Sequence, residues 1–355
     1  MEQIEFNILN NDKKFPNTRY QGSKYKIVNW IWDNIKDLEF NSVLDLFGGT
    51  GVVSYELKKH NKKVIYNDIL KFNSIIGKAL IENNNVKLLD DDVDYILKKH
   101  EDIAYKRTIE DNFKDIFYLD EENKWLDMVC ANINSIENEY KRAIAYFALF
   151  QACLSKRPYN LFHRANLYMR TQEVKRNFGN KITWDKSFEE HFKNFVEEAN
   201  NCLIDVNGCK SINYDALDID INKYKVDMVY IDTPYINIKG MGTDYLDFYH
   251  FLEGIVNYDE WDNLILHKYK HKPIKGRGEN KWTKKKLIFD EFDKLFEKYK
   301  DKILVISYRG DGIPSEEEIK SLLLKYKKNI KEIKVKDYKY ALSKTESKEL
   351  LFIGY

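Results

Sequence analysis

The sequence predicts an α/β fold whose sheet is mostly parallel and is interrupted by a helical insertion. Residues 41–69 have the pattern of a strand, a glycine turn, a helix and a second strand. Helical periodicity then dominates, and strand patterns resume only later in the chain. A chain of 355 residues is long enough for about two domains. We therefore predict a discontinuous sheet domain of residues 1–85 and 206–355 around a helical insertion of residues 86–205.

The β-α-β unit is the clearest single element. An apolar run over residues 43–47 predicts a buried strand, and Gly48-Gly49-Thr50-Gly51 predicts a turn after it. An amphipathic helix follows as far as Lys59. The segment KKVIYNDI (residues 62–69) predicts the second strand, which ends at Asp68.

The middle of the chain predicts helices, most clearly over residues 132–154 and 188–203. The longest apolar stretch, residues 143–154, is too short to span a bilayer and predicts a buried helix. The N-terminal sequence MEQIEFNILNNDKK lacks the basic-then-apolar order of a signal peptide. We therefore expect a soluble, cytoplasmic protein with no membrane segment.

Strand patterns resume after the insertion. They cover residues 209–213, 226–231, 302–308, 330–340 and 349–355. The last two alternate between apolar and polar residues and lie close together in the chain, so we expect an antiparallel hairpin at one edge of the sheet.

Composition excludes several classes of protein. With a net charge of +1, the chain cannot bind nucleic acid through its overall charge, so phosphate binding requires local basic patches. Only 5 prolines argue against collagen-like or proline-rich architectures. The 4 cysteines form no CxxC pair and no zinc-finger spacing, which indicates reduced core residues.

The glycine turn and the carboxylates around it favour one kind of cofactor. Ser54 stands where a dinucleotide fingerprint, G-x-G-x-x-G, requires its third glycine. Asp45, just before the turn, would repel a pyrophosphate but would suit the ammonium of a methionyl group. Asp68, at the end of the second strand, can accept hydrogen bonds from ribose hydroxyls. These residues fit S-adenosylmethionine (SAM) better than NAD; the alternative is a purely structural glycine turn.

The strand end VDMVYIDTPY places Asp232, Thr233, Pro234 and Tyr235 where ligands bind in open α/β sheets. Methylation of an exocyclic amine needs two acceptors for the amino hydrogens, because they localise the nitrogen lone pair. The Asp232 carboxylate and the Thr233 carbonyl can supply them, Pro234 fixes the turn, and Tyr235 offers a face to an extruded base. The alternative is an ordinary strand-end turn with a capping aspartate.

Together these motifs resemble the adenine-N6 DNA methyltransferases with the Dam-like catalytic fold. The motif order is that of the alpha arrangement, and the chain is particularly similar to the methylases of type II, including type IIS, restriction–modification systems. The resemblance covers most of the chain, through RYQGSKYK (residues 19–26), DLFGGTG (45–51), Asp68, NYDAL (213–217) and DTPY (232–235). Thr233 departs from the usual D-P-P-Y, and we expect tolerance because that position acts through its main-chain oxygen.

The resemblance implies a Rossmann-like SAM-dependent methyltransferase that flips its target adenine, needs no metal and works in the bacterial cytoplasm. It implies duplex DNA as substrate, a cognate restriction endonuclease linked by function without physical association, and a monomer or weak dimer. The residues expected to contact the cofactor are Tyr20, Lys24, Asp45, Phe47, Gly48, Gly49, Gly51, Asp68, Ile69 and Asp215.

Two segments carry local basicity suited to DNA. SKRPYNLFHRANLYMR (residues 155–170) interleaves basic and aromatic residues and is the candidate for base reading. Its candidate contacts are Lys156, Arg157, Asn160, Arg164 and Arg170. The alternative is a solvated basic face whose aromatic residues lie in the core.

The second basic segment, residues 267–286, predicts a mobile loop that clamps phosphates, with Lys284, Lys285 and Lys286 as candidate contacts. The alternative is a surface loop without a partner. YLDFYHF (residues 245–251) predicts either a wall of the base pocket or a core helix. His163, His250 and His267 each lack a recognisable nucleophile partner, so we expect structural roles for them.

The leading prediction is a site-specific DNA adenine-N6 methyltransferase of a type II restriction–modification system. An RNA or orphan DNA methylase and a catalytically silent DNA-binding module are the alternatives. The missing third glycine disfavours an NAD-dependent oxidoreductase, and Asp232 favours adenine over N4 of cytosine as the target.

Overall fold

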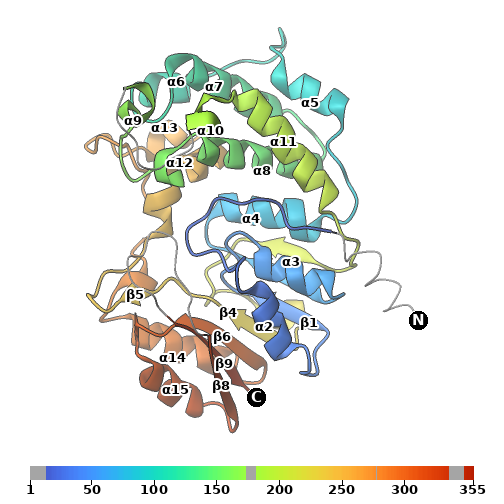
Figure 1. The fold of residues 1–355 in the computed structure, drawn as a ribbon, viewed down its shortest axis with the longest axis vertical. Coiled ribbons are helices and arrows are strands. Elements are labelled where there is room, and N and C mark those ends of the chain that lie inside the picture. Colours follow the sequence, from blue (N-terminus) through green and yellow to red (C-terminus); the bar gives the residue numbers. More distant parts are fainter. Residues whose placement is uncertain (1–12, 173–180, 277, 336–347) are drawn as a thin grey trace.

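The computed structural model describes residues 13–172, 181–276, 278–335 and 348–355. Its strands gather at one end of the molecule and most of its helices at the other, with α4 (Lys71–Gly77) between them (Figure 1). The predicted α/β class is confirmed.

The central sheet has seven strands. Their order is β3 (Lys210–Ile212), β2 (Lys63–Asn67), β1 (Ser42–Asp45), β4 (Met228–Ile231), β6 (Ile303–Arg309), β9 (Glu349–Gly354) and β8 (Ile330–Lys334). The first five run parallel, whereas β9 is antiparallel to both β6 and β8. The predicted antiparallel hairpin at the sheet edge is therefore confirmed, although the second half of the predicted 330–340 strand lies outside the described residues.

The strand order places a switch point at the centre of the sheet. From β1 the chain proceeds to β2 and β3 on one side, and it later returns to β4 on the other side. Crevices that bind ligands form at such points, outside the carboxyl ends of the strands. Asp45 at the end of β1 is in register with Tyr230 of β4, so the residues that follow both strands emerge together.

Several helices lie at the sheet end of the molecule (Figure 1). They are α2 (Val28–Ile35), α3 (Val52–Lys59), α14 (Ile288–Lys298) and α15 (Glu316–Leu324). α14 illustrates why they pack: Ile288, Phe292, Leu295 and Phe296 recur at helical spacing and are all fully buried, whereas acidic and basic residues occupy the other face. A separate two-stranded sheet joins β5 (Ile236–Asn237) to β7 (Gly312–Ile313).

The helical part of the chain contains the following elements: α5 (Asp90–Leu97), α6 (Thr108–Asn112), α7 (Asp120–Asn134), α8 (Glu139–Ser155), α9 (Tyr168–Thr171), α10 (Lys181–Asp185) and α11 (Phe188–Asn201). α8 is buried throughout residues 143–155, as its apolar sequence predicts. The single helix predicted over residues 132–154 is two helices, because Asn138 caps α8 by accepting hydrogen bonds from the backbone of Tyr140 and Lys141.

Two later helices also join this helical part. In α12 (Tyr245–Val256), Phe251 packs against Phe113, Phe162 and Trp261, and Trp261 belongs to α13 (Trp261–Leu264). Figure 1 shows both helices beside α6 and α8. The helical part therefore includes residues 245–264, which the predicted boundaries leave in the sheet domain.

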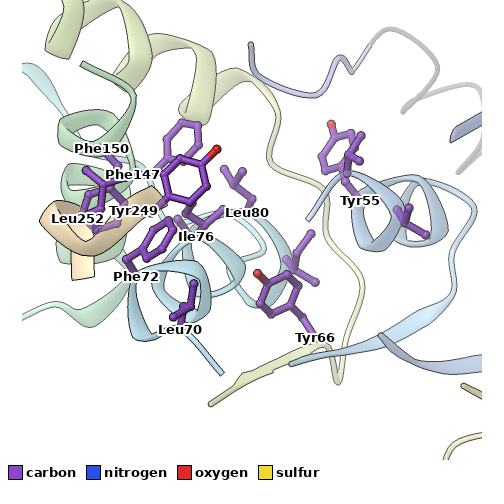
Figure 2. Close-up of a cluster of buried hydrophobic side chains, with 14 of the residues drawn as sticks. Tyr55, Tyr66, Leu70, Phe72, Ile76, Leu80, Phe147, Phe150, Tyr249 and Leu252 are labelled. Atoms are coloured by element: carbon purple, nitrogen blue, oxygen red, sulfur yellow. The ribbon is translucent and has the colours of Figure 1, made fainter. Parts of the chain in front are cut away.

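α4 connects the two parts through buried aromatic side chains (Figure 2). Phe72 lies 5.8 Å from Phe150 of α8 and 5.8 Å from Tyr249 of α12, measured between ring centroids. The sheet and the helices therefore share one continuous hydrophobic core.

All four cysteines are buried and free, as predicted. Among the described residues, no helix is both long and apolar enough to cross a membrane.

Candidate active site

A cavity of about 850 Å³ lies at the carboxyl ends of β1, β2 and β4. Its volume is typical of ligand pockets, which measure roughly 300–1,000 Å³. Its lining includes Tyr20, Lys24, Asp45, Phe47, Gly48, Gly49, Asp68, Ile69, Asp215, Asp232, Pro234, Tyr245 and Trp282. The glycine turn and the aspartate of DTPY therefore face one shared cavity.

The glycine turn is held in place from two sides. Gly49 has a φ of +50°, which favours glycine, and a Cβ at Gly48 would lie 2.1 Å from the ring of Tyr66. The Tyr66 hydroxyl donates to the Gly49 carbonyl at 2.7 Å, and the Gly49 N–H donates to Asp68 at 3.0 Å. Gly51 begins α3 with a φ of +79°; it shapes the turn without lining the cavity.

Asp45 is 1% exposed and belongs to the lining of the cavity. Its Oδ2 accepts a 2.7 Å hydrogen bond from Ser54, the residue that breaks the dinucleotide fingerprint. Its Oδ1 accepts no hydrogen bond of normal geometry from the described residues. Burial raises the pKa of Asp45 to about 7. A cationic ligand at this oxygen would satisfy both the missing contact and the buried charge.

Asp68 and Asp215 are fixed by backbone hydrogen bonds at the same cavity. Asp68 Oδ1 accepts from the N–H of Leu70 at 2.8 Å, and Asp215 Oδ1 accepts from the N–H of Leu217 at 2.9 Å. Each carboxylate oxygen has two lone pairs, so both side chains keep acceptor capacity for hydroxyl groups or a base. Ile69 also lines the cavity and is 41% exposed.

Asp232, whose side chain is 19% exposed, belongs to a cluster of one ammonium and two carboxylates in which Lys24 and Glu349 are buried. Lys24 Nζ lies 2.8 Å from Asp232 Oδ1 and 3.2 Å from Glu349 Oε1. Ser307 also donates to Glu349 Oε1, at 2.6 Å. Burial raises the pKa of Asp232 to about 6; the Lys24 ammonium opposes this rise, and the Glu349 carboxylate adds to it. Sequence reasoning missed Glu349, which lies on β9 far from any motif.

The other DTPY residues lie beside the cavity without lining it, apart from Pro234. The Thr233 side chain is buried, and its hydroxyl has no hydrogen-bond partner among the described residues. The Tyr235 ring is covered by the guanidinium of Arg309, which lies 4.8 Å from the ring centroid. Asp311 holds that guanidinium through two hydrogen bonds of 2.6 Å. One face of Tyr235 is therefore occupied by a cation–π contact.

Aromatic rings form the remaining walls. Tyr20 stacks on Tyr249 at 4.5 Å and on Tyr245 at 5.5 Å between centroids. Residues 245–251 thus contribute both to the cavity and to the core: Tyr245 lines the cavity, and Tyr249 is fully buried. Phe47 meets Trp282 edge-on at 5.3 Å. Sequence reasoning missed Trp282, whose neighbours in the chain are mostly basic.

The prediction that Arg157 reads bases is wrong. Arg157 is 1% exposed, and its guanidinium donates to the carbonyl of Leu161 at 3.0 Å and to that of Arg164 at 3.0 Å. These bonds fold the chain back around Tyr159 and Asn160, which have φ values of 62° and 57°. The guanidinium therefore supports a strained turn from inside the protein.

Lys156 is buried and the Arg170 side chain is only 7% exposed, so their assignment as DNA contacts is wrong too. Glu122 pairs with both: Lys156 Nζ lies 2.9 Å and Arg170 Nη2 lies 2.7 Å from its Oε1. Arg164 is exposed and Asn160 is half-buried. These two remain the candidates for DNA contact in this segment.

The second basic segment does more than predicted, because part of it forms a wall of the cavity. Trp282, in the short helix η4 (Lys281–Thr283), is buried, and Ile274 pairs with Ile265 in an isolated bridge. We expected a mobile loop, but these residues of the segment are packed against the rest of the protein. Lys284, Lys285 and Lys286 are exposed, and Lys284 lies 3.7 Å from Glu279.

The histidines have no catalytic geometry. His250 is fully buried, its Nε2 lies 3.1 Å from the Phe162 carbonyl, and burial lowers its pKa to about 3. His267 is exposed and His163 is half-buried against Phe248.

Comparison with known proteins identifies the family. The family model for D12 class N6 adenine-specific DNA methyltransferases matches residues 20–311. The chain is 28% identical to the type II methyltransferase M2.HphI of Haemophilus parahaemolyticus, over 97% of this chain and 98% of that relative.

Two further relatives are longer. The chain is 28% identical to the type II methyltransferase M.FokI of Planomicrobium okeanokoites, over 86% of this chain and 46% of that relative. It is 27% identical to the modification methylase StsI of Streptococcus sanguinis, over 94% of this chain and 51% of that relative. The chain thus spans about half the length of these two proteins. The match over residues 20–311 includes every residue that lines the cavity, and the chain belongs to the D12 class N6 adenine-specific DNA methyltransferases.

Proposed function

We propose that the protein methylates N6 of an extruded adenine in duplex DNA, with SAM as donor, as the modification enzyme of a type II restriction–modification system. The observation that carries this proposal is the shared cavity, because Asp232 and the glycine turn both line it. A donor held by the turn and an amine held by Asp232 would then meet inside one enclosed space.

The residues around the glycine turn fit SAM, which supplies an electrophilic methyl group when bound. The open oxygen of buried Asp45 suits the methionyl ammonium. Asp68 suits the ribose hydroxyls, and Asp215 and Ile69, which also line the cavity, suit the adenine of the cofactor. Tyr20 and Phe47 supply aromatic walls, while Gly48 and Gly49 let the backbone approach closely.

Asp232 and Thr233 prepare the amine for attack. Lys24 engages Oδ1 of Asp232 and favours its ionised form, which leaves Oδ2 to accept one amino hydrogen of the target adenine. The Thr233 carbonyl accepts the other. Withdrawing both hydrogens toward acceptors localises the nitrogen lone pair on the side that faces the donor. After methylation the nitrogen is acidic, and Asp232 is placed to receive the proton it releases.

DNA is held by polar and basic groups of the two basic segments. Half-buried Asn160 belongs to the turn that Arg157 supports and exposed Arg164 follows it, and both are suited to base edges or phosphates. Lys284, Lys285 and Lys286 follow the cavity wall and are suited to phosphates. We propose action in the bacterial cytoplasm as a monomer or weak dimer, alongside a cognate restriction endonuclease that is linked by function and not by physical association.

Mapping the product tests this function. The protein is incubated with methylation-free plasmid DNA and SAM labelled in its methyl group, and the DNA is then digested to nucleosides and sequenced for modified bases. The expected product is N6-methyladenine within one short motif. Label found only in N4-methylcytosine, or only in RNA offered in competition, would contradict the proposal.

A further inference from the structure

The segment between the catalytic motif and α12 carries two apolar side chains into solvent. This rim turn (residues 236–242) exposes 76% of Ile238 and 61% of Met241. Among the large apolar side chains of the described residues, only Ile182 is more exposed than Ile238, at 79%. Pro234 and Asp244, which flank the segment on its two sides in the chain, both line the cavity. The exposed side chains therefore belong to a short turn that is bracketed by cavity-lining residues.

The rim turn is ordered, so the exposure is not that of a frayed loop. Asn237 closes it: its N–H donates to the Met241 carbonyl at 3.0 Å, and its carbonyl accepts from Gly240 at 2.8 Å. Its side-chain Oδ1 also accepts from the N–H groups of Lys239 and Met241, at 2.9 and 3.1 Å. Ile236 pairs with Gly242 across the base of the turn and with Ile313 of β7. The backbone thus holds the apolar tip in a defined position.

The surroundings of the rim turn are basic. A Cβ at Gly242 would lie 2.5 Å from the Thr283 carbonyl, so the turn packs directly against η4. Lys281 and Lys284, on either side of Thr283 in the chain, are exposed and lie 3.9 Å from Glu291 and 3.7 Å from Glu279. Lys239 is exposed on the turn itself. An apolar tip among ammonium groups is complementary to duplex DNA, whose phosphates surround stacked bases. An apolar protein partner would not match the lysines.

We propose that Ile238 and Met241 insert into the duplex beside the target adenine and occupy the space that the adenine vacates. Extruding a base breaks its stacking and pairing, and apolar side chains that enter the stack compensate for part of this loss. The rim turn directly follows the motif that receives the base, so insertion and capture occur at one place. This inference rests on the proposed function, because it requires an extruded adenine.

The test compares two duplexes that carry the mapped recognition site. In one the target adenine pairs with thymine, and in the other it faces an abasic position, where extrusion is already easier. The full-length double variant Ile238→Ser, Met241→Ser is compared with wild type and with Ile182→Ser, a matched control whose isoleucine is 79% exposed on α10. A second double variant, Ile238→Leu with Met241→Leu, preserves apolar bulk.

We expect the serine variant to lose about tenfold or more in kcat/KM on the paired duplex and to stay within about threefold of wild type on the abasic duplex. The leucine variant and Ile182→Ser should behave as wild type on both. No loss on the paired duplex, or equal losses on both duplexes, would overturn the inference. If wild type methylates neither duplex, the proposed function itself fails.

Discussion

The ammonium of Lys24 lies 2.8 Å from Oδ1 of Asp232, and it joins the first motif of the chain to the catalytic motif more than 200 residues later. Lys24 also lies 3.2 Å from Glu349, so one buried cation pairs with two carboxylates. The negative charge of Glu349 influences how readily the Asp232 carboxyl ionises. The pH dependence of methyl transfer should therefore depend on Glu349.

Glu349→Gln should extend methyl transfer to lower pH. Asp232 must be ionised to accept the amine, and its pKa of about 6 predicts that kcat falls as pH drops below about 6. Glu349 raises that pKa, so removing its charge lowers the pKa of Asp232 and moves the acid limb of the profile to lower pH. The measurement is the single-turnover rate constant of methyl transfer as a function of pH. An unchanged limb would mean that Glu349 does not act through Asp232.

Binding of SAM should release a proton near neutral pH. Burial raises the pKa of Asp45 to about 7, whereas a bound ammonium requires the ionised carboxylate. The affinity should therefore weaken by up to about tenfold per pH unit below pH 7. The same raised pKa makes Asp45 stabilise the ligand-free protein at low pH, and this contribution is lost as pH rises from about 4 through about 7. Calorimetry in buffers of different ionisation enthalpy measures the released proton; Asp45→Asn should release none.

Arg157 and Arg164 should separate stability from DNA binding. Arg157→Ala leaves the carbonyls of Leu161 and Arg164 without their donor and opens a cavity, so it should lower the free energy of unfolding by about 2–4 kcal/mol. Arg164→Ala changes an exposed side chain and should leave stability within about 0.5 kcal/mol while weakening DNA binding. Urea unfolding and gel-shift titration measure the two effects. Full DNA affinity in Arg164→Ala would remove that residue from the interface.

Neutralising Lys284, Lys285 and Lys286 together should weaken binding to all DNA sequences alike. Phosphate contacts carry no sequence information, and each one lost should flatten the dependence of log affinity on log salt by about one unit. Filter binding at several salt concentrations, with cognate and unrelated duplexes, measures the slope. A loss confined to the cognate duplex would instead indicate base reading by these lysines.

The sequence predicts the elements whose pattern is local. The apolar run before Gly48 and the one before Asp232 fix β1 and β4, and because both strands are parallel their ends meet at the same sheet edge. The alternating C-terminal segments likewise predict the β8–β9 hairpin. Where a short pattern predicts both a strand and the residues at its carboxyl end, the position of the site residues can be predicted from the sequence.

Features that depend on contacts between residues far apart in the chain cannot be predicted from local sequence patterns. Arg157 appears basic and accessible in sequence, yet two positive-φ residues turn the chain so that later carbonyls enclose its guanidinium. Glu349 and Trp282 reach the site only because β9 and η4 pack beside it. α12 follows the catalytic motif but packs with the helices, because Phe251 finds its aromatic partners there.

Asp232→Asn tests the central claim most directly. The substitution keeps the shape of the side chain but removes the negative charge of the carboxylate. That carboxylate pairs with Lys24 and accepts a hydrogen of the adenine amine. SAM binding, measured by calorimetry, should stay within a few-fold of wild type, whereas single-turnover methyl transfer to the mapped site should fall by about 100-fold or more. Asp301→Asn, an exposed aspartate remote from the cavity lining, should change neither quantity. Wild-type rates of methyl transfer in Asp232→Asn would contradict the assignment of Asp232 as the acceptor for the adenine amine.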